Sequence, residues 1–404
     1  MDKFALKAKG FIDISGQEAR LHKDEMLLIE GERIAGFVKL ADLPSEIQVI
    51  DFVNGFVLPG LVDLCFLPHM MFDDEGAPPD NYGESVWHAK NALANWLRSG
   101  VTTAATMGAP ERLDKDLADC IKREILTGPE IIPALQPLVP AGGADFPWGY
   151  GVREVNGQDD ARRAVRELIK QGADRIVVYA DVPLVFSADP NVTARERLNF
   201  SKAELSEMVS EAKHAGCFVH AQAISRKAIE LCASAGVRSI GCGFQLDREL
   251  FPIMRENNVA VAPNLSLGST VGKYGPEIGI SRSMVDLVVS QRISGQTLLE
   301  ARDFGIDIVC GTNAALMQGD VVEECYCLKE IGFSAREILQ SATVKAASAV
   351  KPYSIVGSFK QNNLADLLVL EGNPLENLDT LNQIREVMLR GKFINLNSGG
   401  DARE

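Results

Sequence analysis

A repeating order of helix, glycine and short apolar strand most constrains how this chain of 404 residues can fold. Residues 201–212 begin with a capping box and carry apolar side chains at helical spacing, Gly216 ends that helix, and residues 217–220 have the composition of a strand. The same order recurs over residues 159–179, where Asp159 is the predicted helix cap, and over residues 229–240. Units of this kind through the middle of the chain predict a parallel β/α architecture.

A (β/α)8 TIM-like barrel fits the number and order of these units, and its chemistry would lie at the carboxyl ends of the strands. The alternative is a doubly wound open sheet. Because no glycine-rich phosphate loop follows any predicted strand, the sequence favours the barrel.

Short predicted strands occupy both ends of the chain. Residues 26–30 and 34–38 flank a turn at Gly31 and predict a hairpin, and residues 365–370 form another apolar run that stops at a Gly-Asn-Pro sequence. We therefore predict a composite β-sandwich domain built from residues 1–58 and 357–404, with the barrel formed by residues 59–356.

Composition excludes several classes of partner. The net charge of −14 argues against a surface for nucleic acid or anionic membranes. The N-terminus has no apolar signal region, and no run approaches the roughly 18 apolar residues of a membrane helix. Eight scattered cysteines without a CxxC pair indicate reduced, mostly buried thiols. We expect a cytoplasmic protein that binds a small molecule, and a homo-oligomer is a further expectation.

Residues 56–69 read as a buried strand entered through a tight turn at Pro59-Gly60. This stretch resembles the first barrel strand of the amidohydrolase superfamily, whose pattern is Leu-Pro-Gly-Leu-Ile-Asp-x-His-x-His and whose two histidines hold a catalytic metal. The resemblance implies a barrel inserted between two halves of a β-sandwich. In this chain the two histidine positions hold Cys65 and Leu67.

The resemblance extends over nearly the whole chain and is closest to the imidazolonepropionase and prolidase-like branch. It implies hydrolysis of a non-peptide C–N bond by two metal ions. His220 keeps a metal-ligand position, but the other ligand positions are replaced. They hold Val177 for a lysine that becomes a bridging carbamate, Cys242 for a histidine, Asn313 for the catalytic aspartate and Ala144 for a loop histidine.

These replacements predict that the usual mechanism does not operate. A hydrolytic metal site needs several donor side chains and an open coordination position. Valine, leucine and alanine donate nothing, and the neutral amide of Asn313 is no general base.

Three hypotheses remain if Cys65, His220, Cys242 and Asn313 converge at the barrel mouth. The protein is an inactive homologue, a pseudoenzyme, that binds a small molecule or a protein partner. Alternatively, it performs metal-free chemistry with Cys65 or Cys242 as nucleophile, Cys242 with His220 being the preferred pair and Asn313 the donor to an oxyanion. Neither of these needs a cofactor. The third hypothesis is a single zinc ion held by Cys65, His220 and Cys242, with water in the fourth position.

Each of these residues also has a purely structural interpretation. The cysteines can be small fillers of a vacated site, His220 a hydrogen-bonded core histidine and Asn313 the cap of a loop.

For substrate binding we predict Asn264, which follows the predicted strand 259–263, together with Trp148 and Tyr150 in a loop over the pocket.

Overall fold

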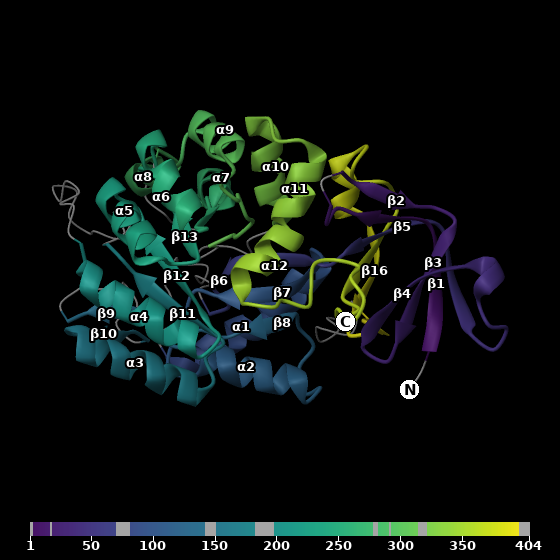
Figure 1. Cartoon of the computed structure of the whole chain (residues 1–404), viewed down its shortest axis with the longest axis horizontal. Coiled ribbons are helices and arrows are strands. Elements are labelled where there is room, and N and C mark those ends of the chain that lie inside the picture. Colours follow the sequence, from purple (N-terminus) through teal and green to yellow (C-terminus); the bar gives the residue numbers. More distant parts are fainter. Residues whose placement is uncertain are drawn as a thin grey trace.

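The computed structural model describes residues 3–16, 18–69, 81–141, 151–181, 198–277, 282–290, 292–313 and 321–395. It is an α/β protein. Figure 1 shows parallel strands accompanied by helices in one part of the molecule, with a largely antiparallel β-sheet beside them. Strands from the beginning and the end of the chain, purple and yellow in the figure, lie together in that sheet.

The β-sheet has eight strands in the order β17-β16-β15-β5-β1-β3-β4, with β2 paired to β1. Their bounds are β1 Lys3–Asp13, β2 Arg20–His22, β3 Glu25–Glu30, β4 Arg33–Lys39, β5 Gln48–Pro59, β15 Leu367–Leu370, β16 Ile384–Leu389 and β17 Lys392–Phe393. The predicted hairpin is β3–β4. Strand β5 joins the two halves because it pairs in parallel with β1 and antiparallel with β15.

The remaining strands are parallel and form a three-stranded sheet, β6-β7-β8, and a six-stranded sheet, β10-β9-β11-β12-β13-β14. Their bounds are β6 Leu61–Phe66, β7 Val101–Thr106, β8 Glu130–Ile132, β9 Leu138–Pro140, β10 Arg153–Val155, β11 Arg175–Tyr179, β12 Phe218–Ala223, β13 Ser239–Cys242 and β14 Ala260–Ala262. The helices are α1 Tyr82–Arg98, α2 Leu113–Lys122, α3 Gln158–Gln171, α4 Lys202–His214, α5 Arg226–Ala235, α6 Phe251–Glu256, α7 Leu265–Tyr274, α8 Arg282–Ser290, α9 Gly295–Phe304, α10 Val321–Ile331, α11 Ala335–Ser341 and α12 Val344–Val350.

Backbone hydrogen bonds outside the named strands link the edges of these two sheets. The amide of Asp174, just before β11, donates to Pro133 O, just after β8, at 2.8 Å. On the other side, Val309 N donates to Val261 O at 2.9 Å and Leu64 N donates to Cys310 O at 3.1 Å. Residues 306–310 thus lie between β14 and β6.

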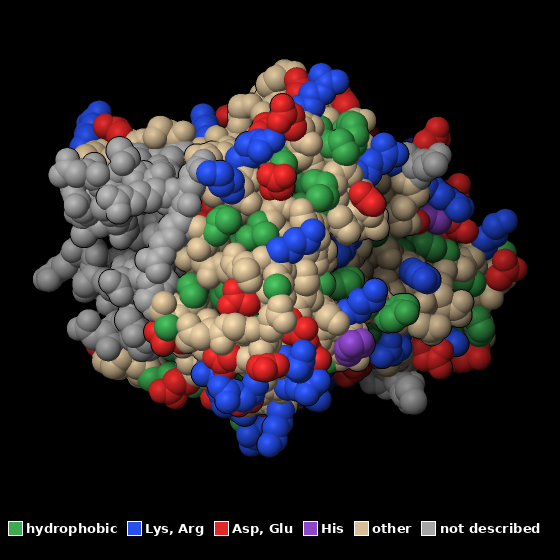
Figure 2. Space-filling model, turned by 60° about the vertical axis from the view of Figure 1, so that its left-hand side comes forward, with side chains coloured by type: hydrophobic (Ala, Val, Ile, Leu, Met, Phe, Trp, Pro, Cys, Tyr) green, Lys and Arg blue, Asp and Glu red, His purple; other side chains and the backbone are tan. Residues whose placement is uncertain are grey.

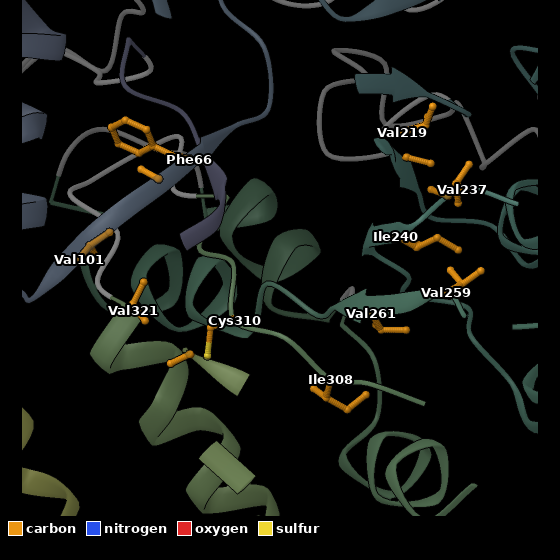
Figure 3. Packing of buried hydrophobic residues seen from close by; sticks show 14 of the residues in the cluster. Phe66, Val101, Val219, Val237, Ile240, Val259, Val261, Ile308, Cys310 and Val321 are labelled. Carbon is orange, nitrogen blue, oxygen red and sulfur yellow. The ribbon is translucent and has the colours of Figure 1, made fainter. Parts of the chain in front are cut away.

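Alternate residues of the parallel strands belong to two different apolar clusters. In β11, Ile176 and Val178 pack with residues of the surrounding helices, whereas Val177 and Tyr179 belong to a second cluster formed largely by the strands. Figure 3 shows the first cluster, to which successive strands contribute Val219, Ile240, Val261 and Ile308. Burial on both faces is typical of parallel sheets. On each strand, alternate residues therefore pack against the helices or against residues of the other strands.

Local sequence signals account for some of the helix starts, whereas α2, α6, α7 and α12 begin without a hydrogen bond to a capping side chain. The capping boxes predicted at Ser201 and Ser334 are both present. The prediction that Asp159 caps its helix was wrong. Helix α3 begins at Gln158 with Gly157 at the N-cap, where a φ of 79° favours glycine, and Asp159 lies in the first turn. A carboxylate there still interacts favourably with the helix dipole.

The surface shown in Figure 2 carries acidic and basic side chains side by side. Among the described residues, no helix combines the length and the apolar character that crossing a membrane requires. All eight cysteines are free thiols, and Cys325 and Cys327 lie on α10.

The carboxyl group of Asp366, buried at the start of β15, gives a testable pH dependence. Its Oδ1 accepts a hydrogen bond from Arg390 N at 2.7 Å, while Oδ2 has no described partner. Burial raises its pKa from 3.8 to about 7. Because the folded-state pKa lies above the unfolded value, the stability that this group contributes is complete below about pH 4 and is lost as the pH rises through 7.

We expect Asp366→Asn to abolish that loss, so that the variant gains up to about 4 kcal/mol relative to the parent at pH 8. Urea unfolding at several pH values from 4 to 8 measures it. Glu324, a second buried carboxyl with a pKa raised to about 7, leaves a residual slope. If the free energy of unfolding of the variant fell with pH as steeply as that of the parent, Asp366 would not be the cause of the pH dependence.

Candidate functional site

Four of the predicted site residues lie together where the parallel strands end. Cys65 Sγ lies 3.9 Å from His220 Nε2, and Asn313 Nδ2 lies 3.6 Å from Cys242 Sγ. The backbone links the two pairs, because Asn313 N donates to Cys65 O at 2.9 Å. Parallel strands deliver their carboxyl ends to one edge, so residues far apart in the sequence meet there.

His220 contacts Cys65 and not the predicted partner Cys242. Its Nδ1 lies 2.8 Å from Ser239 Oγ, so both ring nitrogens have neighbours within the protein. Burial lowers the pKa of His220 well below 6.5, and the positive charge of Arg175 lowers it further. The imidazole is therefore neutral at physiological pH.

Cys242 is held by amide groups. Gln222 Nε2 donates to its Sγ at 2.7 Å, and Asn313 Nδ2 approaches the same sulfur. Its backbone has a φ of 64°, which is uncommon for a residue with a β-carbon. Burial raises the pKa of Cys242 to about 12 and raises that of Cys65 as well. Both side chains are thus protonated thiols, whereas a nucleophilic cysteine needs its thiolate.

Asn264 joins two strand ends. Its Oδ1 accepts a hydrogen bond from Cys242 N at 2.8 Å, and its Nδ2 donates to Gly311 O at 2.7 Å. These contacts give it a structural role, and its predicted contact with substrate stays a prediction. Trp148 and Tyr150, also predicted to bind substrate, lie outside the described residues, as does Ala144.

Asp63 fixes the end of β6 with four hydrogen bonds. Oδ1 accepts from the amides of Cys65 at 2.9 Å and Thr312 at 3.0 Å. Oδ2 accepts from Trp96 Nε1 at 2.9 Å and from Thr312 Oγ1 at 2.7 Å. This carboxyl group therefore sets the position of Cys65 relative to the segment that carries Asn313.

Sequence reasoning missed Arg175, a buried cation beside the site. Its Nη1 donates to Leu64 O at 2.8 Å, and its Nη2 is buried without a hydrogen-bond partner in the described part of the chain. Burial lowers its pKa to about 10, so the guanidinium remains charged at neutral pH. The alternation of strand residues was the available signal, because Arg175 is two residues from Val177 and points to the same side of β11.

Gln222 was missed for the same reason, since it is two residues from His220 on β12. Gly241 makes room for both side chains. A β-carbon at that position would lie 2.4 Å from Gln222 Oε1 and 2.9 Å from His220 Nε2. The pairing of Gln222 with Cys242 therefore depends on the glycine of the neighbouring strand.

The residues present do not fit a binuclear metal centre. Within the described ranges, no group of three His, Cys, Asp or Glu side chains is placed to hold a metal ion. Val177, at the position where the family resemblance places the carbamate lysine, packs in the apolar cluster formed largely by the strands. The buried charge of Arg175 also opposes binding of a dication close to Cys65 and His220. The predicted zinc set of Cys65, His220 and Cys242 is likewise not assembled as a metal-binding group in the part of the chain that the structure describes.

Residues 56–394 match the model of the amidohydrolase family. An ochratoxinase from Aspergillus niger is 26% identical over 242 residues, which are 59% of this chain and 50% of that protein. The chain thus aligns with about half the length of this curated relative.

Solved structures resemble the whole chain. A Xaa-Pro dipeptidase with methionine bound in its active site has a TM-score of 0.85 and 25% identity, with 97% of this chain and 99% of that chain covered. The crystal structure of A. niger ochratoxinase has a TM-score of 0.78 and 22% identity, with 97% and 95% covered, which shows a shared fold.

Proposed function

The chain belongs to the amidohydrolase family, and from that premise we propose that it is a metal-independent member, a pseudoenzyme whose strand-end site binds a small molecule with an amide-like C–N bond. The observation that carries the proposal is the set of side chains at the strand ends, because no group of three His, Cys, Asp or Glu side chains within the described ranges is placed to hold a metal ion. Cys65 and Cys242 are buried thiols, His220 is a neutral imidazole, and the buried charge beside them is the cation Arg175. A binuclear hydrolase needs anionic ligands and a base at these places.

The fold supports a site of this kind. We propose that β6, β7, β8, β11, β12, β13, β14 and residues 306–310 form the eight strands of a TIM-like barrel. The hydrogen bonds of Pro133 O and Cys310 O to neighbouring strands support closure of that ring. We further propose that residues 1–58 and 357–404 form the composite β domain, which agrees with the sheet shared by both ends of the chain.

The site can recognise a ligand with the donors it retains. Arg175 Nη2 is a buried N–H group without a described acceptor, and leaving such a group unpaired costs about 1–3 kcal/mol. A carbonyl or carboxylate oxygen of a ligand, or an ordered water, would satisfy it. The names of the similar proteins, Xaa-Pro dipeptidase and ochratoxinase, make Xaa-Pro dipeptides and ochratoxin reasonable first candidates.

A second function is favoured by one contact, the 3.9 Å separation of Cys65 Sγ and His220 Nε2. In metal-free hydrolysis the thiol proton of Cys65 would pass to Nε2 while Sγ bonds to the carbonyl carbon of the substrate. The C–N bond would then break, and the amine would leave with the proton from Nε2. Water would then release the acyl group and restore the thiol. The raised pKa of Cys65 opposes the first step, so we rank this function below binding.

The decisive experiment combines metal analysis with ligand assays. We expect plasma mass spectrometry to find far less than one metal ion per chain in protein purified without chelators or metal-affinity resin. We also expect Xaa-Pro dipeptides or ochratoxin to raise the melting temperature without being hydrolysed, with or without added zinc.

Two outcomes would overturn the proposal in different directions. Stoichiometric zinc that Cys242→Ser removes would establish the Cys2His zinc site. Metal-free hydrolysis that Cys65→Ser abolishes, while Cys120→Ser on α2 retains it, would establish thiol catalysis. The cytoplasmic location and a homo-oligomer stay predictions.

A further inference from the structure

A cavity of about 750 Å³ lies at the ends of the parallel strands opposite to Cys242. Its lining includes Phe218, the first residue of β12, and residues that immediately precede β13 and β14. The segment between α12 and β15 covers another side of it. The cavity is therefore separate from the strand-end site and independent of the function proposed for that site.

Four basic side chains line this cavity, from Lys213, Arg238, Lys351 and Lys360. Among the described residues, those that line the cavity include no aspartate or glutamate, although the chain carries a net charge of −14. In Figure 2 the molecule is hollowed beside the β-sheet, and basic side chains lie around the hollow. Like charges gathered around one cavity repel one another, so an anion in the cavity would be stabilised by all four.

Arg238 is the most firmly placed of the four. Its Nη1 donates to Asn258 O, its Nη2 lies 3.3 Å from Ser348 Oγ, and its guanidinium lies 5.7 Å from the centre of the Phe218 ring. Asp307 acts on it electrostatically, but the carboxylate of Asp307 is itself paired with Lys345 at 3.2 Å. A pre-positioned guanidinium loses little freedom when it binds an oxyanion.

The rest of the lining suits a phosphorylated molecule. Ser354 and Ser358 supply hydroxyl groups that can donate to phosphate oxygens, whereas the hydroxyl of Ser348 donates to Lys345 O at 2.7 Å. Tyr353 is 96% exposed, so one ring face is available for stacking. A volume of about 750 Å³ falls within the usual range for small-molecule sites.

We propose that this cavity binds a small organic molecule carrying two or more phosphate groups, with the nucleoside polyphosphates as the class that also uses Tyr353. The charges of Lys213 and Lys360 act from the exposed rim, and Arg238 and Lys351 act from the half-buried part. The proposal involves binding only, and the bound phosphates would offset the repulsion among the four basic side chains.

The test uses isothermal titration of the intact protein with ATP in magnesium-free buffer at low salt. Charge reversal at the rim, Lys213→Glu with Lys360→Glu, is expected to weaken ATP binding at least about tenfold. The matched control, Lys202→Glu with Lys329→Glu, changes the net charge equally at exposed lysines outside the cavity and is expected to bind ATP as the parent does.

Two further ligands separate the sources of affinity. Inorganic triphosphate is expected to bind, more weakly than ATP, and adenosine is expected not to bind. Equal weakening in both double variants, adenosine binding as tightly as ATP, or no heat of binding with millimolar ATP would each overturn the proposal. Unchanged melting temperatures without ligand confirm that both double variants fold.

Discussion

Cys65 and Cys242 will react with iodoacetamide about a thousandfold more slowly than an ordinary thiol near neutral pH. The thiolate is the reacting form, and a pKa raised from 9.0 to about 12 leaves Cys242 with roughly a thousandth of the usual thiolate fraction. Burial raises the pKa of Cys65 further, and both side chains are almost wholly inaccessible. Peptide mapping by mass spectrometry after timed labelling gives the rate at each cysteine.

The chain contains its own reference for this measurement. Cys120 on α2 is only partly buried, so it is expected to be labelled first. Unfolding in urea should bring all the rates together, because burial is the cause of the difference. Rapid labelling of Cys65 in the folded protein, blocked by a candidate ligand, would instead support a catalytic thiol and count against the binding proposal.

Replacing Asp63 with alanine is expected to reduce the free energy of unfolding by about 3–5 kcal/mol. The side chain is completely buried and accepts four hydrogen bonds, from Trp96, Cys65 and two groups of Thr312. Its removal leaves those donors unpaired in the protein interior and creates a small void. Urea unfolding followed by Trp fluorescence measures the change.

Two variants test whether the hydrogen bonds are responsible. Asp63→Asn has nearly the same shape but presents an amide NH2 to two of the donors, so it should lose a large part of the same stability. Asp51→Ala removes an exposed carboxylate that pairs with Lys7 at 2.7 Å, and its effect should stay within about 1 kcal/mol. An Asp63→Ala protein as stable as the Asp51→Ala protein would show that the buried network contributes little.

The motif around Asp63 predicted the local strand but not the hydrogen-bond partners of this residue. The sequence around Pro59-Gly60 predicted a buried strand after a tight turn, and β6 begins at Leu61. A β-carbon on Gly60 would lie 2.0 Å from Thr102 Oγ1 on the neighbouring strand, so the glycine is required by packing. The partners of Asp63, more than 200 residues away in the case of Thr312, were invisible to local patterns.

The sequence by itself predicted the alternation of helices and parallel strands and the strands at both chain ends, and the structure places those end strands in one sheet. The replacement of metal-ligand residues follows from the family resemblance and stays a prediction. Periodicity, glycine and capping residues act over a few neighbours and can be read in order along the chain. Only the tertiary structure decided that His220 faces Cys65, that Gln222 and Asn313 hold Cys242, and that Arg175 lies beside them. The contacts and the protonation states of these side chains depend on burial and on charges from distant strands. Burial and the distances between strands are set only when the chain folds.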